Sequence, residues 1–359
     1  TMAKRGQTRS LGTPRPDLEQ LFRQGQKGYS GADGCLSFPL SKGRDLWMFG
    51  DTIVGGRNHP DPLVMPRNSV GVLHTDRRGN REFSFHWKEK KGVPYDFFDP
   101  PKPGEWLWPG TGCLSEDKII FFLRRMRTDM GGQSEAFHFA YAGPWVIRVE
   151  NPKDTPDDWV QTPLRVDLPR SVMWGSASFS DRDGYVYLWG GASGRRGAGI
   201  VVARTQAEQL HRGRADRWEF FHRKGEEVVW SKDTSRLATI IPETPSEISL
   251  SYLKKRKLYL IVYGNWKKNL VGLRVAKNLM GPWSPYLQVY SPPEPTWCDQ
   301  YFCYASKGHT ELDPTETELI ITYMCNSHDI WRLTEDDRVY YPRFISVPLD
   351  EVERLLNEF

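Results

Sequence analysis

The sequence predicts an all-β fold, a five-bladed β-propeller that forms one domain of the 359-residue chain. Three observations carry this prediction. The composition combines 14 Trp, 15 Tyr and 17 Phe with 32 Gly and 26 Pro, which suits short strands joined by many turns. A weak repeat of two β-patterned runs around a short turn occurs five times. One further strand pattern remains after the fifth copy and can close a ring.

Each copy of the repeat predicts a hairpin, in which a run that starts with small or polar residues leads through a turn into a run rich in aromatic residues. A lone hairpin is unstable, but blades stacked around an axis bury both faces of every sheet. Runs such as IIFFL and LYLIVY, which are apolar on both faces, fit this double burial. The five predicted hairpins span Gly31–Thr52, Trp108–Met126, Met173–Gly191, Ser246–Asn265 and Tyr301–Asn326.

The remaining segments are placed around these hairpins. Outer strands are predicted in each unit, for example over Gly199–Thr205 and Leu270–Lys277. Arg338–Leu349 has the pattern of a strand that closes the ring against the first blade. We therefore expect an irregular lead-in over residues 1–28, the propeller over 29–349 and a short amphipathic helix over 350–359.

Charge and cysteine content limit the partners. The 49 basic and 45 acidic residues are interspersed and leave a net charge of +4, which indicates a solvated surface and no nucleic-acid partner. The basic run Lys254–Lys257 falls where a hairpin turn is expected. No run of about eighteen apolar residues predicts a membrane span. The five cysteines lack CxxC spacing, and Cys298 and Cys303 are either bridged or buried as thiols. We expect a monomer.

Polar residues at the starts of the predicted inner strands are expected to converge on one mouth of the propeller, because the innermost strand of each blade lines the channel. Asp51 joins this group, since the first hairpin returns the chain towards the end at which it began. The other members of the group are Asp33, Thr111, Ser176, Glu247 and His309.

Asp33 and Asp51 are the first candidate catalytic pair, and Glu247 is the alternative acid. Two carboxylates at one mouth can protonate a departing glycosidic oxygen and activate water or attack the sugar. Each aspartate also has a structural interpretation, Asp33 as a turn cap in GADG and Asp51 as an Asx-turn in GDT. Glu247 lies beside apolar positions of a predicted inner strand, where a carboxylate requires a partner or a function.

Trp108 and Trp174 directly precede inner strands and can stack on sugar rings, although packing in the core is their alternative role. His309 can hold a carboxylate or a sugar hydroxyl, with Glu311 on the same face, or it can be a satisfied structural histidine. HxH, HExxH and DxDxDG spacings are absent, so we predict no metal and no cofactor. GxSxG elbows, Gly-rich phosphate loops and SxDxGxTW boxes are also absent, which argues against phosphate chemistry and sialidases.

The first hairpin, GADGCLSFPLSKGRDLWMFGDT, resembles the signature of the family known as domain of unknown function 4185. Part of that family forms glycoside hydrolase family 183, the endo-D-arabinanases. PRNSVGVL, DGYVYLWGG with IVVART and RWEFF, AKNLMGPWS, and HTEL with ITYMCN follow in the expected order, so that the resemblance extends from about Gly31 to Leu349.

This resemblance implies a five-bladed propeller with a deep acidic site and an extracellular carbohydrate substrate. It points to Asp33 and Asp51 as the essential carboxylates and to Asn68 as a substrate ligand. An inverting reaction, as in family 183, would need one acid and one base, for which we expect Asp51 and Asp33 respectively. The segments WPGTG and GASGRRGAG depart from the arabinanase pattern and leave the sugar open.

We therefore expect a glycosidase that acts on a poly- or oligosaccharide. One alternative is a non-catalytic carbohydrate-binding propeller, in which the acids only accept hydrogen bonds from hydroxyls; another is a protein-interaction scaffold with a broad apolar face. The expected location is secreted or periplasmic. The first residues, TMAKRGQTRS, contain no hydrophobic signal region, so this location would require a signal that is removed.

Overall fold

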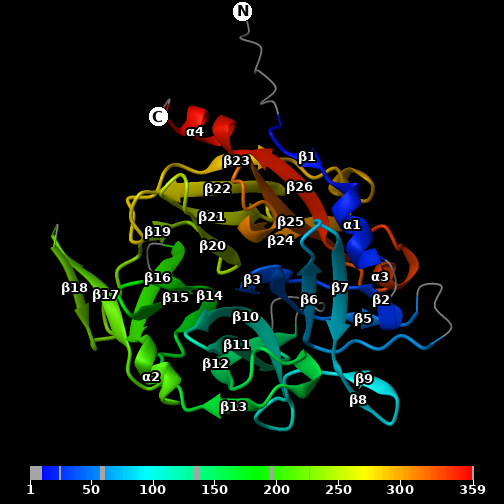
Figure 1. The fold of residues 1–359 in the computed structure, drawn as a ribbon, viewed down its shortest axis with the longest axis horizontal. Coiled ribbons are helices and arrows are strands. Elements are labelled where there is room, and N and C mark those ends of the chain that lie inside the picture. Colours follow the sequence, from blue (N-terminus) through cyan, green and yellow to red (C-terminus); the bar gives the residue numbers. More distant parts are fainter. Residues whose placement is uncertain are drawn as a thin grey trace, which may run out of the picture.

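Five antiparallel sheets surround one axis in chain order in a computed structural model of the protein, which confirms the predicted five-bladed propeller (Figure 1). The structure describes residues 10–23, 26–56, 61–131, 138–194, 197–225 and 227–357. Arg195 and Arg196 of the basic GASGRRGAG segment lie outside these ranges. No helix of the described residues is long and apolar enough to cross a membrane.

Each blade begins with one of the five predicted hairpins, whose two strands are nearest the axis. From the axis outwards, blade one contains β3 (Leu36–Ser41), β4 (Arg44–Phe49), β6 (Ser69–Thr75) and β7 (Arg81–His86), and blade two contains β10 (Glu105–Ser115), β11 (Lys118–Thr128), β12 (Phe139–Val149) and β13 (Gln161–Leu164). Blade three contains β14 (Val172–Ser180), β15 (Tyr185–Gly194), β16 (Gly197–Gln206), β17 (Glu219–Lys224) and β18 (Glu227–Ser231), with β19 (Ile241–Pro242) beside β16. Blade four contains β20 (Ile248–Leu253), β21 (Leu258–Asn265), β22 (Leu270–Ala276) and β23 (Leu287–Tyr290), and blade five contains β24 (Tyr301–His309), β25 (Glu318–Ser327), β26 (Arg343–Pro348) and β1 (Thr13–Pro14).

The ring closes through strands from both ends of the chain. The C-terminal β26 pairs with β25 on one side, and on its other side Ser346 and Ile345 pair with Thr13 and Pro14 of β1. The closing strand was predicted, but its partner is a strand of the N-terminal lead-in and not one of the first blade. Because β1 completes the fifth blade, main-chain hydrogen bonds join the N-terminal and C-terminal strands of the propeller.

The lead-in also contains a helix, where the sequence had predicted mostly irregular chain. Helix α1 (Pro16–Arg23) begins with proline at its first position and has acidic residues in its first turn, both of which favour a helix start. It buries Leu18 and Phe22 against the first and fifth blades. The remaining elements are β2 (Tyr29–Gly31), β5 (Ile53–Val54), β8 (Lys88–Lys90), β9 (Val93–Tyr95), α2 (Ala207–His211), α3 (Arg332–Glu335), α4 (Leu349–Asn357) and the 3₁₀ helices η1 (Gln26–Gly28), η2 (Pro156–Asp158), η3 (Glu294–Thr296) and η4 (Thr310–Leu312).

The described hydrophobic core consists of five clusters, each between two neighbouring blades. Blades one and two, for example, share a cluster to which Leu46 and Phe121 belong. Both faces of each sheet are therefore buried, which explains the continuous apolar runs in the second strands. The described cysteines are all free thiols, so Cys298 and Cys303 are not bridged.

Four of the described inner strands carry bulges. Pairing shifts register between Pro39 and Ser41 in β3, Pro109 and Thr111 in β10, Trp174 and Ala177 in β14, and Tyr304 and Lys307 in β24. Blades two and three approach each other at the bulges of β10 and β14, where a Cβ on Gly110 would lie 2.9 Å from the carbonyl oxygen of Gly175. Bulges re-aim side chains and are common beside active sites.

Candidate active site

Three carboxylates lie at the end of the axis where the inner strands begin. Asp33 precedes β3, Asp51 follows β4, and Glu247 precedes β20. Asp33 interacts electrostatically with both Asp51 and Glu247. The structure therefore brings together, from blades one and four, the three acids that the sequence analysis selected.

Asp33 is held by a short hydrogen-bonded chain from blade five. The Tyr304 hydroxyl donates to Asp33 Oδ2 at 2.8 Å, and Asn326 Nδ2 donates to the Tyr304 oxygen at 3.1 Å. Gly50 leaves room for the carboxyl, because a Cβ at this position would overlap Asp33 Oδ1. Burial, reinforced by Asp51, raises the pKa of Asp33 to about 8, and the Tyr304 hydrogen bond opposes this shift. Asp33 is therefore mainly protonated at neutral pH.

Asp51 has partners that favour its charged form. Trp108 Nε1 donates to Asp51 Oδ1 at 2.9 Å, and the Arg67 guanidinium lies 3.3 Å from the same oxygen. Burial raises the pKa of Asp51, whereas Arg67 and Trp108 act in the opposite direction. The Asp51 side chain is 16% exposed, so its carboxylate remains within reach of solvent.

Glu247 faces two buried cations. Lys307 Nζ donates to the Ile248 carbonyl at 3.1 Å, and Arg124 donates to the Ser246 carbonyl at 3.0 Å. Burial lowers the pKa of Lys307 to about 8 and also lowers the pKa of Arg124, while Glu247 opposes both shifts. These two cations compensate a carboxylate that would otherwise be costly to place here.

Trp108 is the one predicted aromatic platform that lies at these acids, and its indole orients Asp51. Thr111 and Ser176 lie on inner strands but are buried, and Thr111 Oγ1 is 3.1 Å from Ser178 Oγ. Trp174 is only 1% exposed, and its Nε1 donates to the Pro169 carbonyl at 3.0 Å. Because its ring is enclosed, Trp174 packs in the core instead of offering a stacking surface.

Asn68 has a structural role in place of the substrate contact that the resemblance implied. Its Nδ2 donates to the carbonyls of Leu107 at 2.9 Å and Phe98 at 3.3 Å, and its Oδ1 accepts from the Phe98 amide at 2.7 Å. The side chain is fully buried. The amide joins the 96–98 segment to the start of blade two and leaves little capacity for a ligand.

His309 lies at the opposite end of the axis from the three acids. The sequence predicts His309 at a blade start, but β24 begins at Tyr301 and ends at His309. Tyr304, which contacts Asp33, lies five residues before His309, on the other side of a bulge. The imidazole is fully buried, stacks on Trp47 with ring centroids 4.5 Å apart, and its Nε2 lies 2.7 Å from Thr322 Oγ1. The satisfied structural histidine is therefore the interpretation that the contacts favour, and Glu311 lies beside it at that far end.

Several polar residues of this site were not predicted from the sequence: Arg67, Arg124, Tyr304, Lys307, Asn326 and Tyr340. Tyr340, for example, donates its hydroxyl to the Asp51 carbonyl at 3.0 Å. A signal was present for two of them, because Arg124 and Lys307 are cations inside strands that are otherwise largely apolar. Buried charges in such positions require partners or a function. Within the described residues, no group of three His, Cys, Asp or Glu side chains could hold a metal ion.

The raised pKa of Asp33 predicts a pH-dependent stability. Between about pH 4 and pH 8 the folded protein retains a proton on Asp33 that the unfolded chain releases, so stability decreases as the pH rises through this range. Asp33→Asn stays neutral and should unfold at a higher temperature than the parent at pH 8.5, by about 1–2 °C for each kcal/mol gained. The difference should vanish near pH 4. Calorimetric scans at both pH values, with Asp337→Asn as a surface control, test this; a lower Tm for Asp33→Asn at pH 8.5 would contradict it.

Comparisons with known proteins agree with the fold. A family model described as "Domain of unknown function (DUF5005)" matches residues 16–349. No curated protein matches the sequence. A proposed hydrolase from Bacteroides ovatus ATCC 8483 is similar at 17% identity and a TM-score of 0.69, covering 93% of this chain and 89% of that one. The GH43_1 enzyme from Xanthomonas citri is similar at 12% identity and a TM-score of 0.51, covering 94% and 90%.

A third similar structure is RS223-Beta-xylosidase, at 12% identity and a TM-score of 0.50, with coverage of 90% and 93%. At these identities the likeness concerns the arrangement of blades and not the chemistry of the site. The predicted link to domain of unknown function 4185 and to family 183 is not part of these matches and stays a prediction.

Proposed function

This chain belongs to the DUF5005 family, and we propose that it is a glycoside hydrolase whose acid–base pair is Asp33 and Asp51. One observation carries the proposal: two neighbouring carboxyl groups have environments that separate their protonation states. Burial raises the pKa of both groups, that of Asp33 to about 8, but Arg67 and Trp108 oppose the rise at Asp51. Such a separation is how glycosidases assign the roles of acid and base. Neighbours of the same fold that are named as a GH43_1 enzyme and a β-xylosidase support it.

In this mechanism Asp33 is the general acid and Asp51 the general base, the reverse of the order expected from the resemblance. Asp33 donates its proton to the departing glycosidic oxygen as the bond between that oxygen and the anomeric carbon breaks. Asp51 accepts a proton from the water that forms the new bond to the same carbon. The proton then passes from Asp51 back to Asp33 through solvent, and both groups return to their starting states.

Glu247 has a different place in the proposal. Its electrostatic partners Arg124 and Lys307 are both cations. We assign it to orienting the substrate and to balancing the positive charge that develops on the sugar ring in the transition state. Because Lys307 loses its proton near pH 8, this balance changes at alkaline pH.

The test is release of reducing ends from arabinans, arabinogalactans, xylans and β-1,3-galactans by the whole chain. We expect cleavage of at least one of these polymers, and a poly- or oligosaccharide of the arabinan kind is the substrate that the family resemblance favours. The anomer formed first, read by proton NMR, tests the inversion that the resemblance implies. Binding without cleavage would support the carbohydrate-binding propeller instead, and neither binding nor cleavage would favour a scaffold.

A further inference from the structure

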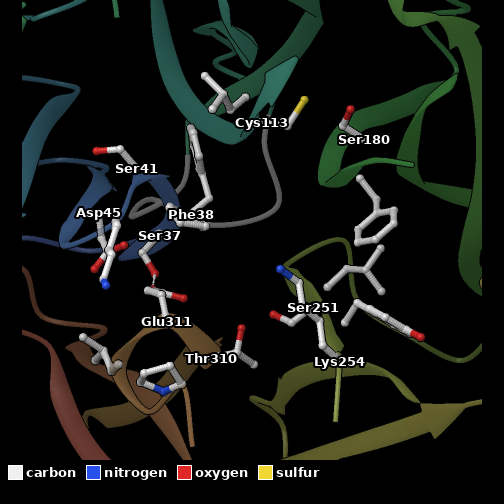
Figure 2. Close-up of a pocket in the computed structure, with 18 of the residues that line it drawn as sticks. Ser37, Phe38, Ser41, Asp45, Cys113, Ser180, Ser251, Lys254, Thr310 and Glu311 are labelled. Atoms are coloured by element: carbon white, nitrogen blue, oxygen red, sulfur yellow. Dashed lines mark hydrogen bonds between the residues drawn. The ribbon is translucent and has the colours of Figure 1, made fainter. Parts of the chain in front are cut away.

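A cavity of about 1570 Å³ opens at the other end of the axis, away from Asp33 and Asp51. It is surrounded by the turns that join the two inner strands of the blades, among them Ser41–Gly43 and Ser180–Arg182. Figure 2 shows side chains from several blades pointing into this space. The volume exceeds the 300–1,000 Å³ typical of small-molecule sites, so an oligosaccharide or a peptide is of suitable size.

One wall of the cavity carries carboxyl groups that are nearly enclosed yet line the open space. Asp45 is 6% exposed and lines the cavity, as does Arg81, which interacts with it electrostatically. Glu311, whose side chain is 8% exposed, accepts a hydrogen bond from Ser37. Figure 2 shows Asp45, Ser37 and Glu311 together on one side of the cavity. Burial, together with Glu311, raises the pKa of Asp45 to about 7, while Arg81 opposes this rise.

The wall formed by blades three and four has a different chemistry. Phe179, Tyr252 and Tyr259 line the cavity there and are each only partly buried. Their rings form one group, with Tyr252 and Tyr259 centroids 4.8 Å apart and Phe179 and Tyr259 centroids 5.6 Å apart. Ser180 and Ser251, next to these aromatic residues in sequence, lie across the cavity from Asp45 in Figure 2. Carboxyl groups therefore face aromatic surface across one space.

The charges around the cavity favour a neutral ligand. Five acidic and six basic residues line it, which nearly balances the two signs, and seven serine and threonine residues add hydroxyl groups. A ligand that matches both walls needs hydroxyls to donate to Asp45 and Glu311 and an apolar face to lie on aromatic rings. We propose that this cavity is a second site, which binds a neutral oligosaccharide through Asp45 and Glu311 on one wall and Tyr252 on the other.

The test is calorimetric titration of the full-length chain with xylotriose, arabinotriose and β-1,3-galactotriose. The chain carries Asp51→Asn, so that no sugar is consumed during the measurement. We expect at least one trisaccharide to show a binding event that Asp45→Asn weakens at least tenfold, because an isosteric amide replaces a buried acceptor. Tyr252→Ala should weaken the same event to a similar extent. Trp108→Ala, at the opposite end of the axis, should leave it unchanged.

Matched controls are Asp337→Asn and Tyr95→Ala, which alter exposed residues outside the cavity. If no trisaccharide gives an event that depends on both Asp45 and Tyr252, the second site is refuted. Binding of a trigalacturonate or a polyamine there in place of the neutral sugars would refute the ligand class. Hydrolysis by the parent chain is measured separately, so a failure of the acid–base proposal leaves this test intact, and the reverse also holds.

Discussion

Replacing Asp33 or Asp51 with asparagine is expected to lower kcat by about 10²–10⁴-fold on the glycan that the parent cleaves. Asparagine keeps the size of each side chain but can neither donate the proton of Asp33 nor accept the one that Asp51 takes from water. Both variants should stay folded, since neither change opens a cavity. Initial rates of reducing-end release, together with circular dichroism spectra, measure the effect. Asp337→Asn, an exposed substitution, should retain the parental rate.

The two variants should differ in a way that identifies their roles. An aryl glycoside with a good leaving group needs little help from an acid, so Asp33→Asn should regain much of its rate on such a substrate while Asp51→Asn should not. The parental rate should also decline above about pH 8, as Asp33 loses its proton. If Asp33→Asn loses no activity on the natural glycan, or if only Asp51→Asn is rescued by the better leaving group, the assignment is wrong.

Phe22→Ala is expected to destabilise the whole propeller by about 3–5 kcal/mol, as for large aromatic truncations in other cores. Phe22 is 1% exposed, and its ring lies 4.4 Å from Phe83, 5.1 Å from Trp47 and 5.2 Å from Phe344, measured between centroids. It therefore joins helix α1 to the first blade and to the closing strand β26. Losing the phenyl group of Phe22 weakens the contact between the first and last blades, where the circle of blades closes.

Equilibrium unfolding in urea measures this change as a lower midpoint at an unchanged slope. The matched control is Gln20→Ala, on the exposed side of the same helix, which should alter stability by less than about 0.5 kcal/mol. A loss below about 1 kcal/mol for Phe22→Ala would mean that α1 lies on the propeller without contributing to its closure.

Several features of the fold could be predicted because they are local patterns. Each inner hairpin is a run of β-forming residues, a turn and a second run, and the turn at Lys254–Lys257 lies where the pattern indicated. The pair Asp33 and Asp51 could be predicted because one hairpin returns the chain to its starting end. The lead-in helix was missed, since its amphipathic pattern covers only eight residues and is stabilised by blades far away in sequence.

Local patterns suffice to predict the number of blades, the hairpins and the position of the acids of blade one, because β-patterned runs and turn residues act over a few neighbouring positions. Which polar residues lie at the same end of the axis depends instead on how the blades pack around it. A side chain reaches one end of the axis or the other according to where its strand begins, and for β24 this separates Tyr304 from His309. Likewise, only the packing of blades placed Arg124 and Lys307 beside Glu247, since a buried charge takes its partner from whichever sheet lies against it.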